Sequence, residues 1–432
     1  MFKIPTVTIR KDKIYTEIKS PLYKNAGYIF INTVVTNGLG FIFWLVVAWY
    51  YTTNEVGFAS AIISSMTLLA ILGTLGFGIA MVRFLPNSDD KNSMVNSFFT
   101  ISSLFTILLS LIFLLGLSIW APKLTLIFDN LIYAVIFILF TLAYMLTLLL
   151  DQAFISMRRA KYMLLKNTIF SVLKIPLPIF LISIGAFGIF SSWGVASAVA
   201  FIIGVSILIP RLLQGYKPGI VIDKRIVKPV LTFSFANYIS NIFTAAPGLL
   251  LPLMIINILS PEMAAYFYIS LMMANLLSMI PQAVSTSLLA EISTNEDTFK
   301  ENKKKAIRSI FIILIPCVII FLIIAEKLLL LFGKAYSEGA LSLLWLLVIS
   351  SIPFAVNRVY VAVKNFKKEI NKVVMVNGLL AFMILVSSYV LMKEIGLIGV
   401  GAGWLISNII VLCAVLLDIK RKKPVRFSNT SS

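Results

Sequence analysis

Long apolar runs, separated by short polar breaks, dominate this chain of 432 residues. A helix of about 20 apolar residues is long enough to cross the hydrocarbon core of a bilayer. Twelve runs reach that length, so the pattern predicts an all-α polytopic membrane protein. The predicted spans lie near residues 27–50, 55–82, 95–119, 131–156, 163–185, 188–210, 228–256, 262–289, 306–332, 339–363, 370–392 and 396–418.

The polar connections between these runs are short. On one side they include residues 52–54 and 260–261, and on the other the longest, near 211–227 and 290–305, have fewer than about 20 residues. They leave no room for a soluble catalytic or nucleotide-binding domain, and the sequence contains no phosphate-binding motif G-x-x-x-x-G-K-S/T. We therefore expect no enzyme activity and no cofactor, and any transport should be passive, secondary or driven by a partner.

Basic residues lie mostly on one side of the predicted bundle. With the spans in place, 32 of the 37 Lys and Arg residues fall on one face: in the tails 1–24 and 419–432, in the connections on their side, or in the span ends next to them. Because basic segments stay in the cytoplasm, both termini are predicted to be cytoplasmic, in a plasma or inner membrane. The net charge of +19 then reflects topology: it predicts contact with anionic lipid headgroups and does not require nucleic acid.

The composition excludes further kinds of site. Hydrophobic residues make up 59% of the chain and the mean hydropathy is +0.98, well above a soluble domain. There is no His, and both Cys residues, Cys317 and Cys413, fall in apolar spans, where a thiol packs as a small apolar group. The commonest metal ligands are missing, so we expect no metal site.

The two halves of the chain share three landmarks in the same order. Residues 121–128 and 325–332 are identical at five of eight positions, the Gly and Trp spacing of 185–193 recurs at 396–404, and the acidic turn 53–55 recurs at 260–262. Six spans separate the equivalents, so both copies share one orientation. The repeat predicts two six-helix lobes, 1–216 and 217–432, related by a pseudo-two-fold axis along the membrane normal and joined by the basic loop 211–228.

Several segments of the first half carry a family resemblance. The stretches 50–57 (YYTTNEVG), 75–86 (LGFGIAMVRFLP), 151–161 (DQAFISMRRAK) and 166–176 (KNTIFSVLKIP) resemble the oligosaccharide flippases of O-antigen type, in the polysaccharide-biosynthesis branch of the MOP superfamily. Many relatives carry Arg near the outer end of the first span, where this chain has Trp49. A Trp at that depth is typical of an interfacial anchor.

Charged residues inside the spans are the first candidates for function. Lys174 lies about 11 residues into the fifth predicted span, near the bilayer midplane, and Asp151 on the fourth span is its expected partner. The pair fits substrate binding by Lys174 and ion coupling by Asp151, and it equally fits a structural ion pair. Arg83 and Arg358 lie near the cytoplasmic ends of their spans, where a guanidinium can bind phosphate or extend to the interface.

Polar and helix-bending residues form a second group of candidates. Asn32 and Asn37 in the first span recur in kind as Asn237 and Asn241 in the seventh, and such amides hydrogen-bond either sugar hydroxyls or a neighbouring helix. The seventh span also holds three residues that favour a bend, either a gate or a static kink: Pro247, Gly248 and Pro252.

The resemblance implies a transporter that moves polyprenyl-(di)phosphate-linked oligosaccharides from the cytoplasmic to the outer leaflet, by alternating access between the two lobes. Its partners would be the lipid-linked glycan, membrane lipids and polysaccharide-assembly enzymes. A cation-coupled exporter of the MATE type is an alternative that predicts a more acidic cavity. A membrane glycosyltransferase or polymerase is a third, and it predicts a catalytic loop that the sequence does not contain.

Overall fold

A computed structural model describes residues 21–294 and 299–421. In this part of the chain all regular elements are helical, and twelve helices are long and apolar enough to cross a membrane, as predicted. The basic tails 1–20 and 422–432 lie outside the described residues. The main helices are α2 (Pro21–Tyr50), α3 (Thr53–Gly73), α5 (Lys91–Leu115), α8 (Leu131–Ser156), α9 (Ala160–Lys174), α11 (Gly185–Ile203), α12 (Lys224–Ile258), α13 (Pro261–Thr294), α14 (Phe299–Leu330), α15 (Lys334–Phe366), α16 (Ile370–Ile395) and α17 (Leu397–Arg421).

Short helical segments complete the chain. Between α3 and α5 lie α4 (Phe77–Phe84) and a 3-10 turn (Leu85–Asn87). Between α5 and α8 lie α6 (Leu117–Trp120), a 3-10 turn (Pro122–Leu124) and α7 (Thr125–Phe128). After α9 come α10 (Leu177–Phe180) and a 3-10 turn (Ile182–Ile184), and α11 continues into a π-helical segment (Gly204–Leu208).

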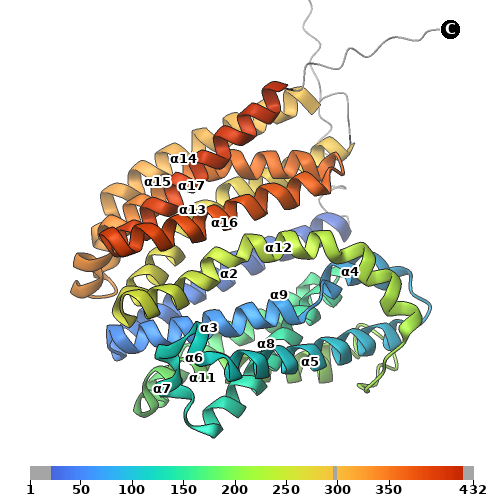
Figure 1. The fold of residues 1–432 in the computed structure, drawn as a ribbon. Coiled ribbons are helices and arrows are strands. Elements are labelled where there is room, and N and C mark those ends of the chain that lie inside the picture. Colours follow the sequence, from blue (N-terminus) through green and yellow to red (C-terminus); the bar gives the residue numbers. More distant parts are fainter. Residues whose placement is uncertain (1–20, 295–298, 422–432) are drawn as a thin grey trace, which may run out of the picture.

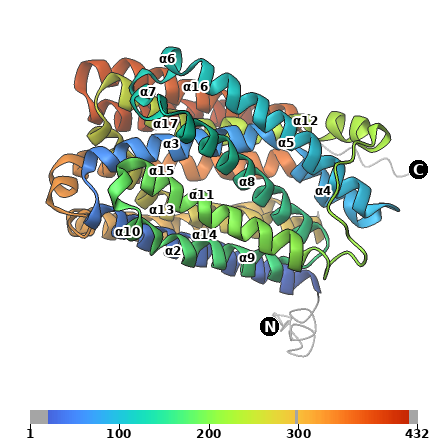
Figure 2. The same cartoon turned by 90° about the horizontal axis from the view of Figure 1, so that it is seen from below.

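The helices form two groups (Figures 1 and 2). In the first, α8 packs on α5 and α11, and α9 packs on α2 and α11. In the second, α15 packs on α13, α14 and α17, and α16 packs on α17. Helix α12 contacts both groups, through α3 and α4 on one side and α13 and α16 on the other. The division into lobes at residue 216 therefore stays a prediction.

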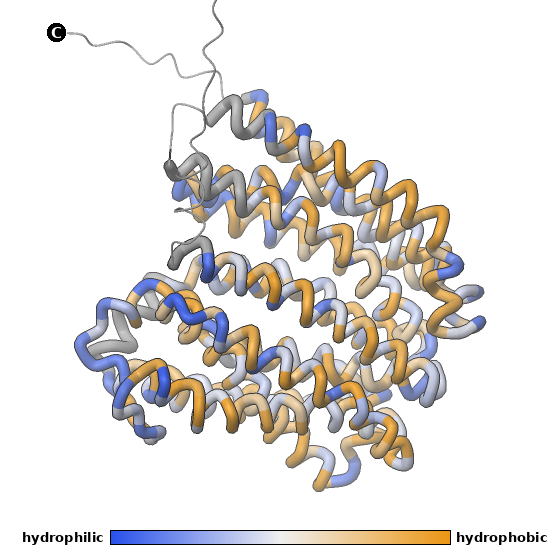
Figure 3. Tube along the Cα trace, turned by 180° about the vertical axis from the view of Figure 1, so that it is seen from behind, coloured by the Kyte–Doolittle hydropathy of each residue, from blue (hydrophilic) through white to orange (hydrophobic). Residues whose placement is uncertain are grey.

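The start of α2 and the end of α17 lie at the same end of the bundle, which we call the basic end (Figures 1 and 2). The two groups of helices diverge toward this end (Figure 1). Hydrophobic residues fill the middle of the bundle and hydrophilic residues concentrate near the helix ends (Figure 3). On α5 the exposed residues Leu104, Leu108, Leu111 and Leu115 recur at helical spacing, so an apolar stripe faces outward, as expected for a surface against lipid.

The second predicted span, 55–82, is divided in the structure. Helix α3 ends at Gly73, and Leu75 (φ 51°) and Gly76 (φ 76°) adopt left-handed backbone before α4 begins. A Cβ on Gly76 would lie 2.9 Å from the Cβ of Tyr238 on α12, so this turn needs both the positive φ and the missing side chain of glycine. The apolar run alone did not indicate the break.

The backbone of the two halves repeats at an offset of 210 residues. After α8, the N–H groups of Met157, Arg158 and Arg159 donate to carbonyls of residues 153, 155 and 154. After α15, those of residues 367, 368 and 369 donate to carbonyls of 363, 365 and 364. Arg158 (φ 55°) and Lys368 (φ 56°) share the same left-handed conformation. Residues 210 apart therefore occupy equivalent positions in the α8–α9 and α15–α16 pairs.

The linker before α12 lies along α5. The side chain of Asn96 donates to the Lys217 carbonyl (2.9 Å), and the N–H groups of Val221 and Asp223 donate to hydroxyls on α5. Tyr216 donates to Asn96 Oδ1 at 2.8 Å, and burial raises the pKa of Tyr216 to about 12, so its hydroxyl keeps this proton at neutral pH. The predicted linker region is thus fixed to the first group of helices.

Candidate functional site

Three cavities lie side by side among these helices. The first, the Asp151 cavity, has a volume of about 360 Å³ and lies between α2, α8, α9, α11 and α13. The second, the central cavity, has a volume of about 480 Å³ and lies between helices of both groups. The third, the Arg358 cavity, has a volume of only about 50 Å³ and lies between α12, α15, α16 and α17. Shared lining residues join them: Asn37, Tyr268 and Met272 border the first two, and Thr244, Phe354 and Trp404 border the last two.

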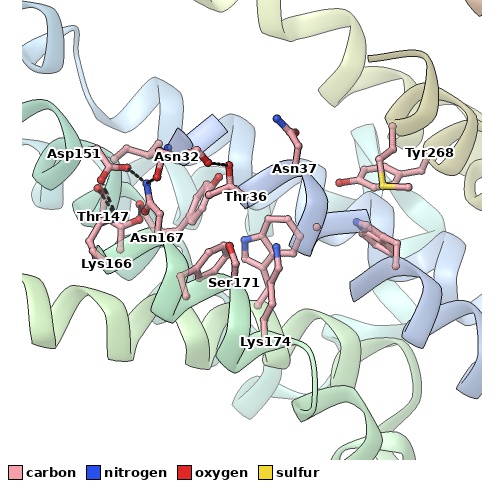
Figure 4. A pocket seen from close by; sticks show the side chains of 17 residues that line it. Asn32, Thr36, Asn37, Thr147, Asp151, Lys166, Asn167, Ser171, Lys174 and Tyr268 are labelled. Atoms are coloured by element: carbon pink, nitrogen blue, oxygen red, sulfur yellow. Dashed lines mark hydrogen bonds and ion pairs between the residues drawn. The ribbon is translucent and has the colours of Figure 1, made fainter. Parts of the chain in front are cut away.

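An ion pair occupies one end of the Asp151 cavity (Figure 4). Lys166 Nζ lies 3.2 Å from Asp151 Oδ1 and also donates to the Thr147 carbonyl. Asn167 Nδ2 donates to Asp151 Oδ2 and to Asn32 Oδ1, at 3.1 Å each. The Lys166 side chain is 2% exposed and that of Asp151 17%. The carboxylate therefore has a cation and an amide as partners, and one face reaches the cavity.

The chain builds this cluster locally. Helices α8 and α9 are consecutive and antiparallel, joined by the turn at Met157–Arg159. Asp151 comes five residues before the end of α8, and Lys166 and Asn167 come six and seven after the start of α9, so the turn brings them to the same depth. The stretches that carry the family resemblance include Asp151, Lys166 and Asn167, but the sequence did not single out Lys166 as the partner of Asp151. The positions of charges along the chain do not reveal which residue of a neighbouring helix lies level with a carboxylate.

Lys174 lies apart from Asp151, contrary to the expected pairing. Its side chain is buried, 3% exposed, and its Nζ lies 4.1 Å from the ring centroid of Trp193, 4.7 Å from that of Phe170 and 5.2 Å from that of Phe43. It forms no ion pair with any described residue. Helix α9 ends at Lys174, just before Pro176, so this ammonium projects at a helix end into an aromatic enclosure.

Other polar groups in the Asp151 cavity have unused hydrogen-bonding capacity. The Ser171 hydroxyl and the indole N–H of Trp193 are buried without a partner in the described structure. Both line the cavity together with Lys174. A buried donor without a partner is costly, so these groups are suited to a ligand or to water in the cavity.

Two of the predicted residues, Arg358 and Pro247, line the Arg358 cavity. Arg358 borders it, with the guanidinium carbon 5.7 Å from the ring centroid of Phe354. Pro247 also lines this cavity, and Gly248 lines the central cavity. Helix α12 runs unbroken past both and past Pro252.

Some predicted residues lie outside all three cavities. Arg83 is exposed near the end of α4, with its guanidinium carbon 5.6 Å from the ring centroid of Phe84. Asn237 and Asn241 on α12 also line none of them. The Ser240 hydroxyl on the same helix instead accepts a hydrogen bond from Asn377 Nδ2 at 2.8 Å. Asn377 was missed, although it lies 210 residues after Asn167.

Direct contacts join the two groups of helices at the end opposite the basic end. Lys123 Nζ donates to the Leu259 carbonyl (3.1 Å), and Asn257 Nδ2 donates to the Trp120 carbonyl (2.9 Å). Trp49, predicted as an interfacial anchor, donates its indole N–H to the Leu331 carbonyl at 2.8 Å. At this end, α14 is thus tied to α2, and the end of α12 to the segment around α6; nearer the basic end, Tyr238 on α12 donates to the Leu72 carbonyl of α3 at 2.6 Å.

Comparisons with known proteins agree with this architecture. A family model described as "Polysaccharide biosynthesis protein" matches residues 22–287. An inward-facing multidrug resistance MATE family transporter of the MOP superfamily is similar in structure (TM-score 0.72, 16% identity, covering 89% of this chain and 93% of that one).

Two further solved structures are similar. The lipid II flippase MurJ, in an inward closed conformation, has a TM-score of 0.67 at 15% identity and covers 90% of this chain and 87% of its own. The MATE multidrug transporter DinF-BH has a TM-score of 0.68 at 13% identity, covering 94% and 96%. At these identities the likeness shows a shared fold. No curated protein matches the sequence.

Proposed function

The chain belongs to the polysaccharide biosynthesis protein family, and from that premise we propose that it moves polyprenyl-(di)phosphate-linked oligosaccharides from the cytoplasmic to the outer leaflet of the cell membrane. It is a multi-pass membrane protein, with twelve candidate spanning helices in residues 21–294 and 299–421. Its product would supply surface polysaccharide or glycan assembly, and the assembly enzymes would be its partners.

The observation that carries the proposal is the unpaired ammonium of Lys174. Asp151 and Lys166 neutralise each other, so Lys174 leaves the Asp151 cavity with one uncompensated positive charge. A buried cation needs an anion or a wet cavity, and a phosphate offers charge and several acceptor oxygens. The unpartnered Ser171 hydroxyl and Trp193 N–H line the same cavity and can donate to the same group.

The central cavity suits the sugars of such a substrate. Hydroxyl and amide side chains from both groups of helices line it, and these groups hydrogen-bond sugar hydroxyls: Asn37, Thr67, Thr244, Asn275, Ser278, Gln282, Ser350 and Ser351. In this proposal the diphosphate lies near Lys174, the glycan extends into the central cavity, and the lipid tail stays in the bilayer. Arg83, exposed near the basic end, contacts the phosphate before entry.

Transport would follow from rocking of the two groups of helices. They diverge toward the basic end and are joined at the opposite end, as expected for a state open to the cytoplasm (Figure 1). Bending of α12 at Pro247, Gly248 and Pro252 would allow the alternate state. An inside-negative potential favours outward movement of an anion by about 2.3 kcal/mol per charge per 100 mV. Asp151 is the candidate for ion coupling, since its protonation would release Lys166 to interact with the phosphate.

A cation-coupled exporter of small molecules is the second candidate. Asp151, the one carboxylate among the residues that line the three cavities, lies next to aromatic lining residues, an arrangement that could accept a cation and an apolar drug. Pairing with Lys166 weighs against it, because the cavity is then cationic overall.

Depletion of the protein in its native host tests the proposal. Mass spectrometry would quantify polyprenyl-linked glycans alongside finished surface polysaccharide. We expect complete lipid-linked repeat units to accumulate while surface glycan is lost. An unchanged lipid pool would favour small-molecule export, and truncated or unpolymerised intermediates would favour a glycosyltransferase or polymerase.

A further inference from the structure

The Arg358 cavity occupies the position in the second half that the Asp151 cavity occupies in the first. Nine lining residues of the one lie 210 residues from lining residues of the other, and Trp193 and Trp404 correspond at 211. The nine pairs are Tyr144 and Phe354, Thr147 and Asn357, Leu148 and Arg358, Asp151 and Val361, Lys166 and Val376, Asn167 and Asn377, Phe170 and Leu380, Ser171 and Ala381, and Lys174 and Ile384. The two cavities are thus repeats of one site.

The charges of the two sites have diverged. All three charged positions of the first site are aliphatic in the second, and the second site gains a charge where the first has Leu148. That charge, Arg358, forms no ion pair with any residue in the described part of the chain. The second site therefore has one guanidinium and no carboxylate in its lining.

Two amide oxygens in the lining of the Arg358 cavity also have no hydrogen-bond donor in the described structure. Asn357 (1% exposed) and Asn408 (0% exposed) both line the cavity, and neither Oδ1 has a donor in the described structure. Their amide nitrogens are already used: Asn357 Nδ2 donates to the Asn408 carbonyl, and Asn408 Nδ2 donates to Ser350 Oγ and the Trp404 carbonyl. These bonds fix both oxygens as acceptors.

A ligand for this site must present acceptors to Arg358 and donors to the two amide oxygens. A phosphate dianion fits poorly, because it presents acceptor oxygens on every side and would meet the Asn oxygens without a donor. A sugar carboxylate flanked by hydroxyls provides both kinds of group. The cavity of about 50 Å³ has room for such a functional group and not for the ring. The ring would lie in the central cavity, where Phe354 and Trp404 border both spaces.

We propose that the Arg358 cavity is a subsite for a carboxylate-bearing sugar, such as a hexuronic acid residue of the transported glycan. The inference rests on the proposed flippase function for its biological meaning, but binding can be measured independently. Arg358 holds the carboxylate, Asn357 and Asn408 accept from sugar hydroxyls, and the aromatic rings of Phe354 and Trp404 contact the sugar ring. The first site selects the lipid phosphate, and the second selects an acidic glycan.

Binding of two matched monosaccharides to the purified full-length protein tests this. Methyl glucuronide and methyl glucoside differ only in the carboxylate, and saturation-transfer NMR titrations report the affinity of each. We expect the glucuronide to bind at least about tenfold more tightly than the glucoside, since a charge-assisted bond to Arg358 separates them. Arg358→Gln should remove this preference, Arg358→Lys should keep part of it, and Arg308→Gln, at an exposed Arg outside the cavities, should leave it unchanged.

Equal binding of the two sugars by the wild-type protein would overturn the inference, without any variant having to fold. A preference for glucuronide that survives in a folded Arg358→Gln protein would also overturn it, since the carboxylate would then bind elsewhere. Either result leaves the flippase proposal standing, because that proposal depends on the lipid-linked glycan pool. Conversely, a glucuronide preference with an unchanged lipid pool would keep the subsite and contradict the flippase function.

Discussion

Replacing Lys174 by Gln should impair transport far more than it impairs stability. The ammonium is buried among three aromatic rings, 4.1 to 5.2 Å from their centroids, and has no carboxylate partner in the described chain. A Lys in the middle of a membrane helix costs about 2.5–3.5 kcal/mol, and desolvated cation–π contacts offset this by up to about 2 kcal/mol each. The two effects oppose each other, and the other two rings lie farther from the ammonium than Trp193, so we expect the free energy of unfolding to change by about 1–3 kcal/mol.

The effect on substrate should be larger. A hydrogen bond between an ammonium and a phosphate contributes about 1.5–3 kcal/mol, which corresponds to a loss of about 10- to 150-fold in binding or transport. Lys174→Arg should retain part of the activity, because the charge is kept. Lys420→Gln, at an exposed Lys near the basic end, is the matched control and should transport normally.

The assay is complementation of a depleted host, with lipid-linked glycan quantified by mass spectrometry and the melting temperature of each purified variant measured. We expect Lys174→Gln to accumulate lipid-linked glycan while its melting temperature stays near that of the wild type. Transport at the native rate would refute the role of Lys174 in binding. A loss of transport that only follows a loss of folded protein would show that the residue is structural.

Three further predictions concern stability. Asp151→Asn leaves the Lys166 ammonium buried without its carboxylate, so this variant should be less stable by about 3–5 kcal/mol. Adding Lys166→Met should restore much of the lost stability, as measured by the denaturation midpoint. No recovery in the double variant would show that the broken ion pair is not the cause. Gly76→Ala should lower the melting temperature, because φ is +76° and the new Cβ would lie 2.9 Å from a side-chain atom. Gly27→Ala is the control: a Cβ there has nothing within 4 Å, so the substitution should be neutral or stabilising. Equal effects of the two substitutions would contradict this reasoning. Burial, and then the charge of Glu55, raise the pKa of Tyr51 to about 12, so the contribution of this residue to stability is present below pH 10 and is lost as pH rises from 10 toward 12. In Tyr51→Phe the free energy of unfolding should therefore fall less steeply between pH 10 and pH 12 than in the wild type. The same pH dependence in both proteins would exclude the effect.

Apolar run length was enough to predict the spans, because a bilayer imposes a minimum length on any helix that crosses it. The break at Leu75 and Gly76 was missed, because a positive φ leaves no trace in hydropathy. The repeat was visible from Gly and Trp spacing, since Gly185 and Gly396 share a positive φ that few other residues adopt.

The site was only partly predictable. Asp151, Lys174 and Arg358 were found because a charge inside an apolar run is conspicuous. The predicted partner of Asp151 was wrong: Lys166 and Lys174 are eight residues apart on α9, about 12 Å along the helix axis, and only tertiary packing shows which of them lies level with Asp151. Asn357 and Asn408 were missed as well, because an uncharged amide in a span is unremarkable until its oxygen is found without a donor.

Reconstituted transport tests the proposed function most directly. The purified protein would be placed in vesicles whose inner and outer leaflets contain a polyprenyl-diphosphate glycan, and a glycan-cleaving enzyme added outside would report the pool reachable from the outer leaflet. We predict that the enzyme cleaves nearly all of the substrate when the wild-type protein is present, and only about half in empty vesicles or with Lys174→Gln. Cleavage that stops near one half with the wild-type protein, under an imposed potential and ion gradient, would contradict transport of lipid-linked glycans by this chain.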